Sequence, residues 1–311
     1  MQVLWTIALP VFGIIFAGYL IGRLRLLGAD SSQALNGFAY WVALPALLLV
    51  SMTRVPIAEV LNLPFIAAFA GGTVLTFGLA VGIGAFAFAN RPAARTMQGL
   101  AAVFANTGYM GVPLFLTAFG VERALPAIIA MVLSASFTMG AGVALVEVGL
   151  SQATNWRHVA ADTARALFGN PLVVAPLLGL LLRAVGIALP VPIETFLTQL
   201  GAAAAPCALF ALGLFLVGTK LRANLPEIGW ITLLKLVAQP AITWMLAVPL
   251  LHLEPFWAAS AVLLSSLPTA ALVFTLAQQY DIYVERASSA ILVTTALSVL
   301  TVPLILVLLG M

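Results

Sequence analysis

The sequence predicts an all-α integral membrane protein whose ten membrane-spanning helices form a 5+5 inverted repeat, with the fourth and ninth helices broken. Composition is the first observation: 63% of the 311 residues are hydrophobic and only 7% are charged, whereas a soluble domain carries about 25% charged residues. The second is that the apolar residues form runs long enough to cross a bilayer. The third is that glycine and proline interrupt two of these runs near their middle.

Ten apolar runs have the roughly 20 residues that a helix needs to cross about 30 Å of hydrocarbon. In chain order they cover residues 3–22, 34–52, 63–88, 97–119, 124–148, 168–187, 194–218, 228–251, 256–279 and 286–310. The first run has no basic segment before it, so we expect a spanning helix and not a cleaved signal. The longest connector, around residues 149–167, is the candidate hinge between the halves.

Lysine and arginine in the loops predict the orientation, because cytoplasmic loops carry an excess of these residues. Loops after odd-numbered runs hold Arg23, Arg25, Arg91, Arg95, Arg157, Arg165, Lys220, Arg222 and Arg286. Loops after even-numbered runs hold only Arg54, Arg123 and Arg183. This bias predicts a multi-pass protein of the cell inner (plasma) membrane, with both termini outside the cytoplasm.

Proline and glycine recur at matching places in the two halves of the chain. The pairs 161 positions apart are Pro10 and Pro171, Gly18 and Gly179, and Pro45 and Pro206, while Asn62-Leu63-Pro64 and Asn224-Leu225-Pro226 are 162 apart. Each half has five runs, and an odd count forces the second half to insert upside down. Residues 1–150 and 151–311 are therefore predicted to be two inverted five-helix repeats.

The fourth and ninth runs correspond in this repeat, and each contains proline beside polar residues. The fourth contains "NTGYMGVPL", whose candidate site residues are Asn106, Thr107, Gly108, Tyr109, Gly111 and Pro113. The ninth contributes Ser265, Ser266, Pro268 and Thr269. Two broken helices at equivalent places in inverted halves are typical of a transporter site at the membrane midplane. The alternative is a pair of proline kinks that only improve packing.

A broken helix presents a partial positive charge at the N-terminus of its second half, so two such ends favour an anionic ligand. Lys235, in the eighth run, can either bind that anion or extend to the cytoplasmic surface. Gln239 lies one turn further along the same face. In the second run Asn36 and Tyr40 share a face, and they line the cavity or form an interface pair. The single cysteine, Cys207, excludes an internal disulfide.

Four segments resemble the auxin efflux carrier family, which includes bacterial malonate-type carriers and is related to plant PIN proteins. They are "NTGYMGVPL", "LKLVAQP", "LPTAALVFTLAQQY" and "ILVTTALSVLTVPL", in the fourth, eighth, ninth and tenth runs. The resemblance covers nearly the whole chain. It implies fourth and ninth helices that unwind and cross at their prolines, and a scaffold of spans one, two, six and seven that supports the other six. It also implies organic anions, such as dicarboxylates or indole acetate, as substrates.

The leading hypothesis is therefore a secondary carrier of small organic anions, with an elevator-like or rocking movement about the midplane site. The alternatives are a cation-coupled (Na⁺ or H⁺) symporter, a channel and a membrane receptor that does not transport. An enzyme is not expected, because no catalytic constellation, metal site or phosphate-binding loop is visible in the sequence. We expect no cofactor and no nucleic-acid partner. The expected partners are the anion and the lipid bilayer, and a homodimer is left open.

Overall fold

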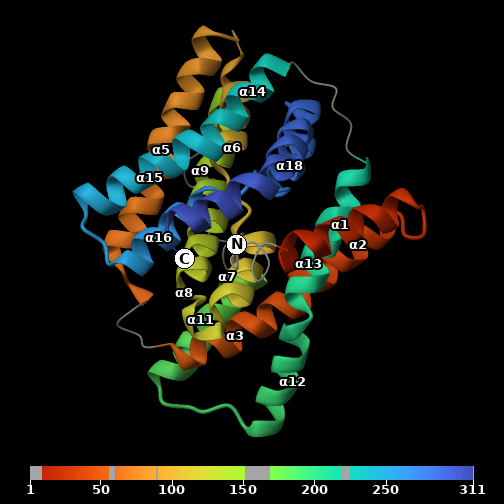
Figure 1. The fold of residues 1–311 in the computed structure, drawn as a ribbon, viewed down its shortest axis with the longest axis vertical. Coiled ribbons are helices and arrows are strands. Elements are labelled where there is room, and N and C mark those ends of the chain that lie inside the picture. Colours follow the sequence, from red (N-terminus) through yellow and green to blue (C-terminus); the bar gives the residue numbers. More distant parts are fainter. Residues whose placement is uncertain (1–8, 56–59, 89, 151–168, 219–224, 311) are drawn as a thin grey trace. The chain divides into compact units, whose positions relative to one another are not determined.

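The computed structural model describes residues 9–55, 60–88, 90–150, 169–218 and 225–310. Within these residues the regular structure is helical, and the β-contact between Ala105 and Thr269 is an isolated bridge. The chain, whose helices are labelled in Figure 1, divides into two compact units. Unit 1 comprises residues 1–62, 108–132 and 164–218, and unit 2 comprises residues 63–107, 133–163 and 219–311.

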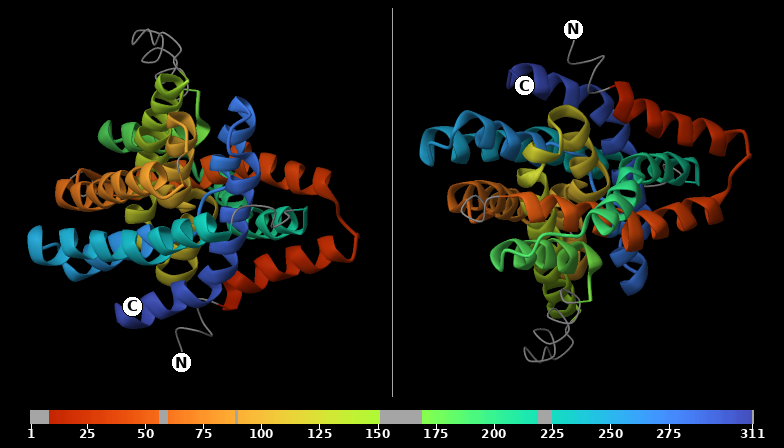
Figure 2. Two further views of the ribbon diagram at one scale, coloured as in Figure 1. Left: turned by 90° about the horizontal axis from the view of Figure 1, so that it is seen from above. Right: turned by 90° about the horizontal axis from the view of Figure 1, so that it is seen from below.

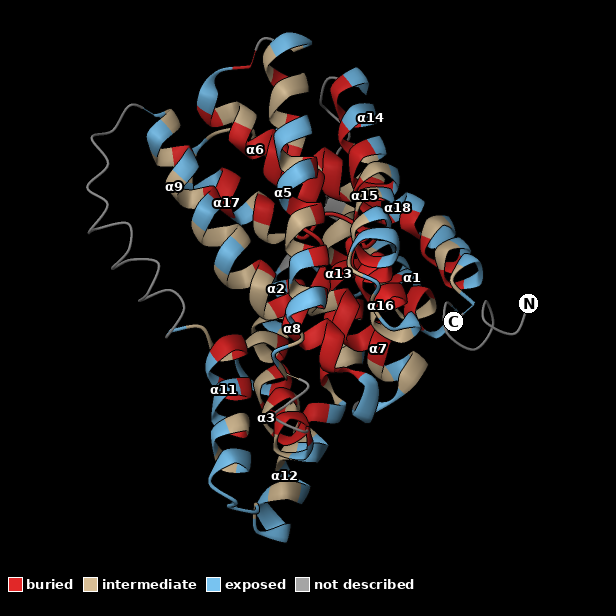
Figure 3. Ribbon diagram, turned by 90° about the vertical axis from the view of Figure 1, so that its left-hand side faces the viewer, coloured by how far each residue is buried: buried red, intermediate tan, exposed pale blue. Residues whose placement is uncertain are grey.

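Among its described residues, unit 1 contains seven α-helices and most of an eighth, together with short turns of other helix types. They are α1 (Leu9–Arg23), α2 (Ala29–Phe38), the π-helical η2 (Ala39–Ala43), α3 (Leu44–Arg54), α7 (Val112–Phe119), η4 (Val121–Arg123), most of α8 (Leu125–Leu133), α11 (Pro171–Ala184), α12 (Val191–Ala202) and α13 (Ala204–Gly218). Figure 3 shows α12 with mostly exposed residues.

Unit 2 is built around the long helix α5 (Leu63–Phe86). Its other elements are α6 (Pro92–Val103), η5 (Ser134–Thr138), α9 (Met139–Gly149), α14 (Leu225–Leu233), η6 (Leu234–Ala238), α15 (Gln239–Met245), η7 (Leu246–Leu250), α16 (Pro255–Ser265), α17 (Leu272–Tyr280) and α18 (Val284–Leu308). The π-helical turn η3 (Thr107–Gly111) crosses from unit 2 into unit 1 along the chain.

The predicted apolar runs are mostly helical where the structure describes them, and the fourth and ninth runs each contain a non-helical stretch. In the described part of the chain, six helical stretches are long and apolar enough to cross a membrane: Asp30–Arg54, Leu63–Phe86, Leu125–Gly149, Val191–Val217, Leu225–Leu250 and Val284–Leu308. Four shorter apolar helices are Leu9–Arg23, Thr107–Phe119, Pro171–Ala184 and Pro255–Ser265. The chain is therefore a multi-pass, all-helical membrane protein, while the inverted relation of its halves stays a prediction.

Several residues used in the sequence analysis lie outside the described part of the chain. They are Met1, Arg157, Arg165, Lys220, Arg222, Asn224, Met311 and most of the candidate hinge at 149–167.

Two helix pairs in unit 1 pack closely through glycine. Helix α1 packs on α13, and a Cβ at Gly18 would meet the carbonyl oxygen of Phe210. Helix α11 packs on α3, where a Cβ at Gly179 would meet the carbonyl oxygen of Leu49. Because glycine has no side chain, the backbones can approach more closely than any other residue allows.

In unit 2, helices α5, α15 and α16 lie side by side (Figures 1 and 2). The buried residues of α5 include Phe65, Phe69, Gly72 and Thr76, which recur every three or four positions and so form one face of the helix. Leu75 and Leu79 on another face of α5 are about half exposed. An exposed face made of leucine is what lipid contact requires, because hydrocarbon does not penalise apolar side chains.

Candidate functional site

The fourth and ninth predicted runs are both interrupted in the structure. Helix α6 ends at Val103, and helical structure resumes only at Thr107. Helix α16 ends at Ser265, and α17 begins at Leu272. Pro268 lies in the second interruption. Proline has no backbone N–H, so in a continuous helix this position would lack one hydrogen bond.

The break in the fourth run is not at Pro113, where the sequence analysis placed it. The backbone leaves the helix at Phe104–Asn106 and is helical again from Thr107 to Phe119. Pro113 lies in the first turn of α7, a position that tolerates proline because the N–H there needs no partner within the helix.

The two interruptions lie against each other inside unit 2. The backbone N–H of Asn106 donates to the carbonyl oxygen of Pro268 at 2.9 Å, and the N–H of Ala270 donates to that of Phe104 at 2.9 Å. Ala105 and Thr269 form the antiparallel bridge between them. Unwound backbone at membrane depth needs such partners, because lipid supplies none. We call residues 104–107 together with 266–271 the crossing.

Lys235 and Gln239 reach this crossing from η6 and the start of α15. The Lys235 ammonium donates to the carbonyl oxygen of Ser265 at 2.6 Å and to Oε1 of Gln239 at 2.5 Å. Nε2 of Gln239 donates to the carbonyl oxygen of Val103 at 3.1 Å and is 3.4 Å from the Thr73 hydroxyl. Lys235 is fully buried, so of the two alternatives left open for it, extension to the cytoplasmic surface is wrong.

The hydroxyl groups of the ninth run are largely used within the protein. Oγ1 of Thr269 donates to the carbonyl oxygen of Ala101 at 2.7 Å. Ser265 and Ser266 donate to carbonyl oxygens of their own helix, those of Val262 and Leu263. The sequence analysis did not single out Thr294, whose hydroxyl accepts from the N–H of Thr269 at 3.1 Å. Threonine is common in apolar helices, so its presence in the sequence does not indicate such a contact.

Asn106 is the exception among these polar side chains. It is 2% exposed, and in the part of the chain that the structure describes its Nδ2 has no hydrogen-bond partner. Thr107 is buried beside it. The other candidate residues, Gly108, Tyr109, Gly111 and Pro113 together with Asn36 and Tyr40, belong to unit 1. Their place in a common site stays a prediction.

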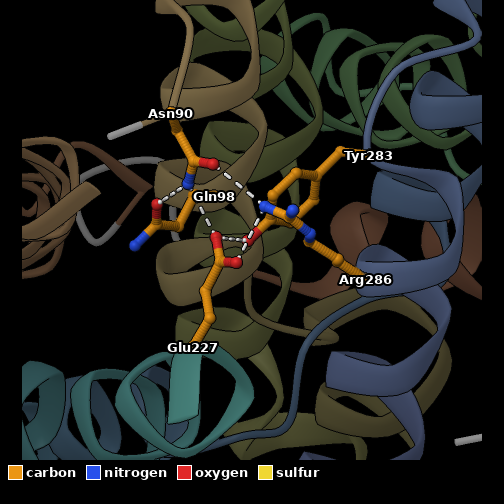
Figure 4. A network of polar contacts seen from close by, with 5 residues as sticks. All are labelled: Asn90, Gln98, Glu227, Tyr283 and Arg286. Carbon is orange, nitrogen blue, oxygen red and sulfur yellow. Dashed lines mark hydrogen bonds and ion pairs between the residues drawn. The ribbon is translucent and has the colours of Figure 1, made fainter. Parts of the chain in front are cut away.

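A second polar cluster lies in unit 2, away from the candidate residues (Figure 4). Glu227, in the first turn of α14, is fully buried. Its Oε2 forms an ion pair with Nη1 of Arg286 at 2.8 Å, and its Oε1 accepts from Asn90 at 2.7 Å and from the Tyr283 hydroxyl. Asn90 also donates to Gln98 at 2.8 Å and accepts from Arg286 at 2.9 Å.

This cluster joins the start of α14 to the start of α18 and to the turn before α6. Burial raises the pKa of Tyr283 well above its usual range, and the hydrogen bond to Glu227 raises it further, so the phenol stays protonated and donates. No pattern in the sequence indicates this cluster, because a glutamate in the first turn of a helix is normally exposed.

An apolar groove of about 880 Å³ runs between α5 and the end of α15, lined by Leu75, Leu79, Phe86, Ile242 and Met245 among others. Its lining residues are all apolar, so it offers no donors to an anion and is better suited to lipid.

The two interrupted apolar runs are joined by backbone hydrogen bonds and by Lys235 and Gln239. This arrangement defines a polytopic membrane protein with buried polar groups where the two interruptions meet. Residues 3–306 match the family described as Membrane transport protein, so the chain belongs to this membrane transporter family, and its resemblance to the auxin efflux carriers is confirmed. A transporter family is not an enzyme class, and it implies a small-molecule substrate.

Curated relatives are similar to this chain over nearly its full length. A protein of Rhizobium meliloti (strain 1021) named "Putative malonate transporter" is 38% identical over 298 residues, covering 95% of this chain and 92% of the relative. An "Uncharacterized transporter" of Methanothermobacter thermautotrophicus is 29% identical over 310 residues, with 95% of each chain covered. The "Uncharacterized transporter YfdV" of Escherichia coli (strain K12) is 27% identical over 305 residues, covering 95% of this chain and 94% of its own.

Proposed function

We propose that this chain is a secondary carrier of small organic anions that binds its substrate at the crossing and works by elevator-like alternating access. The observation that carries the proposal is the Asn106 side chain. A buried amide nitrogen without a partner costs free energy, and a carboxylate oxygen of a bound substrate would supply the missing acceptor.

The electrostatics of the crossing support an anionic ligand. The helical segment Thr107–Phe119 begins directly after Asn106, and α17 begins directly after Ala271. A helix N-terminus carries roughly half a positive charge and unsatisfied N–H groups, so both ends favour a carboxylate. Lys235, which stays in the proposed site, is fully buried in the same unit. We retain Gly108, Tyr109, Gly111, Pro113, Asn36 and Tyr40 in the proposed site.

A dicarboxylate is the substrate class that we favour, because the relative with 38% identity carries malonate in its name. Indole carboxylates, the other class implied by the auxin efflux carriers, form the second arm of the test. The membrane potential can drive export of such anions, since one negative charge gains about 2.3 kcal/mol per 100 mV when the inside is negative.

The inverted repeat is part of the proposal, and the packing of unit 1 supports it. Gly18 and Gly179 are repeat partners in the sequence, and each is the glycine at which a first-repeat helix meets a second-repeat helix. In one pair α1 meets α13, and in the other α11 meets α3. The first span pairs with the seventh and the sixth with the second, which is the exchange that two inverted repeats would produce.

The test is counterflow in proteoliposomes that contain the purified protein. Vesicles preloaded with unlabelled malonate should take up radiolabelled malonate in a saturable manner, faster than vesicles without internal substrate. Non-saturable flux would indicate a channel, and binding without flux would indicate a receptor. If neither dicarboxylates nor indole carboxylates bind or move, the proposed substrate class is wrong.

A further inference from the structure

Two helix C-termini meet at the crossing, and one helix turn caps both. Val103 is the last residue of α6, and Ser265 is the last residue of α16. The carbonyl oxygen of Val103 accepts from Gln239, and that of Ser265 accepts from Lys235. Lys235 and Gln239 lie one turn apart and bond to each other, so they join the two helix ends.

The charge at this place is balanced without a carboxylate. Each helix C-terminus carries roughly half a negative charge on its free carbonyls, so two of them together offset about one ammonium. Among the described residues, the polar atoms bonded to the Lys235 ammonium are the neutral oxygens of Ser265 and Gln239. A buried lysine is normally costly in a membrane span, and the two helix ends explain why this one is tolerated.

Carbonyl oxygens at the broken ends of helices are also the groups with which transporters coordinate a coupling Na⁺. We infer that Lys235 is a built-in cation that occupies the position a coupling ion would otherwise fill. This inference rests on the proposed carrier function and deepens it, because it selects anion transport without a Na⁺ or K⁺ requirement over the cation-coupled alternative. The same charge keeps the two helix C-termini from repelling the substrate anion.

The first test uses the parent protein alone. Malonate counterflow should proceed at the same rate, within about twofold, when external Na⁺ or K⁺ is replaced by N-methyl-D-glucamine at equal ionic strength. A requirement for Na⁺ or K⁺ would overturn the inference, since the position would then not be filled by the protein itself.

The second test removes the ammonium and offers small cations in its place. Lys235→Ala leaves the oxygens of Ser265 and Gln239 facing a vacated space, whereas Lys235→Met is the matched control that fills the space without charge. Chloride salts of Na⁺, K⁺, ammonium and methylammonium are compared with N-methyl-D-glucamine. At least one small cation should raise the melting temperature of Lys235→Ala by about 2–5 °C and leave Lys235→Met and the parent unchanged.

Transport should follow the same pattern. Lys235→Ala should lose about tenfold or more of its malonate counterflow in N-methyl-D-glucamine and recover part of it in the stabilising cation. A folded Lys235→Ala variant that responds to none of the four cations would overturn the inference. If the parent protein moves no malonate, the proposed function is wrong. The melting temperatures do not depend on the substrate, so they still test whether Lys235 takes the place of a cation.

Discussion

At the scale of single residues, the polar side chains at the crossing are of two kinds. Some form hydrogen bonds within the protein, whereas the Asn106 side-chain nitrogen has no partner among the described residues. The hydroxyls of Ser265, Ser266 and Thr269 donate to backbone carbonyls and so stabilise unwound or terminal turns. Asn106 uses its backbone N–H for the fold, while its side-chain nitrogen lacks a partner among the described residues. The backbone and the side chain of the same residue can therefore be tested apart.

We expect Asn106→Ala to weaken malonate binding while leaving the protein folded. The substitution keeps the backbone hydrogen bond to Pro268 and removes a donor for the substrate. A hydrogen bond to a charged group contributes about 1.5–3 kcal/mol, which corresponds to roughly 10-fold to 150-fold in the dissociation constant. The measurement is equilibrium binding of radiolabelled malonate to the purified protein.

Asn170→Ala is the matched control, because Oδ1 of Asn170 accepts from the N–H of Leu172 and caps α11. It should lower stability by about 1 kcal/mol and leave the malonate affinity unchanged. If Asn106→Ala instead lowers the melting temperature and spares binding, Asn106 is a structural residue.

The buried ion pair of unit 2 supports a second prediction at this scale. Arg286→Ala should destabilise the protein more than Glu227→Gln, because Glu227 is fully buried while the Arg286 side chain is 37% exposed. The first change leaves a buried carboxylate without its cation, which costs about 3–5 kcal/mol. The second leaves a guanidinium that water can reach.

The double variant should melt above Arg286→Ala alone, since the unpaired carboxylate is gone. Thermal unfolding of the four proteins in detergent measures the difference. Equal melting temperatures for the two single variants would show that the ion pair adds little to the stability of unit 2.

At the scale of helices, the interruptions in the fourth and ninth runs depend on each other. Residues 104–106 and 266–271 leave the helix and exchange backbone hydrogen bonds, so each satisfies groups that unwinding frees in the other. Neither break would be stable in lipid alone. This mutual dependence explains why Pro113, the most visible helix breaker of its run, is not at the break.

Close helix contacts in unit 1 give a prediction at the same scale. Gly18→Ala should destabilise the protein by about 1–3 kcal/mol, because the added methyl would meet the Phe210 carbonyl oxygen and force α1 away from α13. Gly179→Ala should have a similar cost at the contact of α11 with α3. Melting temperatures in detergent measure both.

Gly13→Ala on the same helix is the control, since a Cβ there would meet nothing within 4 Å. It should be neutral or stabilising, because alanine favours a helix over glycine by about 1 kcal/mol. If Gly18→Ala behaves like Gly13→Ala, the helices can separate freely and the close contact does not hold them.

At the scale of the whole molecule, the compact units do not follow the two halves of the sequence. Unit 1 takes helices from residues 1–150 and from 151–311, and so does unit 2. Unit 1 contains the first, second, sixth and seventh runs, the set that the family resemblance assigns to a scaffold, and it also contains residues 108–132. This division is compatible with the proposed elevator-like motion, in which one body moves against another.

Orientation is the prediction that belongs to this scale. The excess of basic residues in odd-numbered loops predicts that both termini face out. Alkaline phosphatase fused after Met311, or placed before Met1 behind an export signal, should be active, while a cytoplasmic reporter at either place should be silent. Two termini that both report from the cytoplasm would reverse the orientation, and termini on opposite sides would contradict the ten-span count.

Composition and periodicity determined the class of this protein, because only lipid can solvate a chain with so few charged residues, and helices are the form in which a single apolar run satisfies its own backbone. They also indicated which two runs are interrupted, because both combine proline with glycine or with polar residues near the middle of the run. These properties are local, so the sequence alone reveals them.

Tertiary structure decided where the fourth run breaks, which way Lys235 points and that the Asn106 side-chain nitrogen has no partner among the described residues. The break lies at residues 104–106 because the backbone of 268–270 supplies partners there. Lys235 turns inward because the carbonyl oxygen of Ser265 and Oε1 of Gln239 accept from its ammonium. Glu227 is buried because Arg286, Tyr283 and Asn90 surround it. Each outcome depends on groups far apart in the chain, and no local pattern in the sequence records which of them meet.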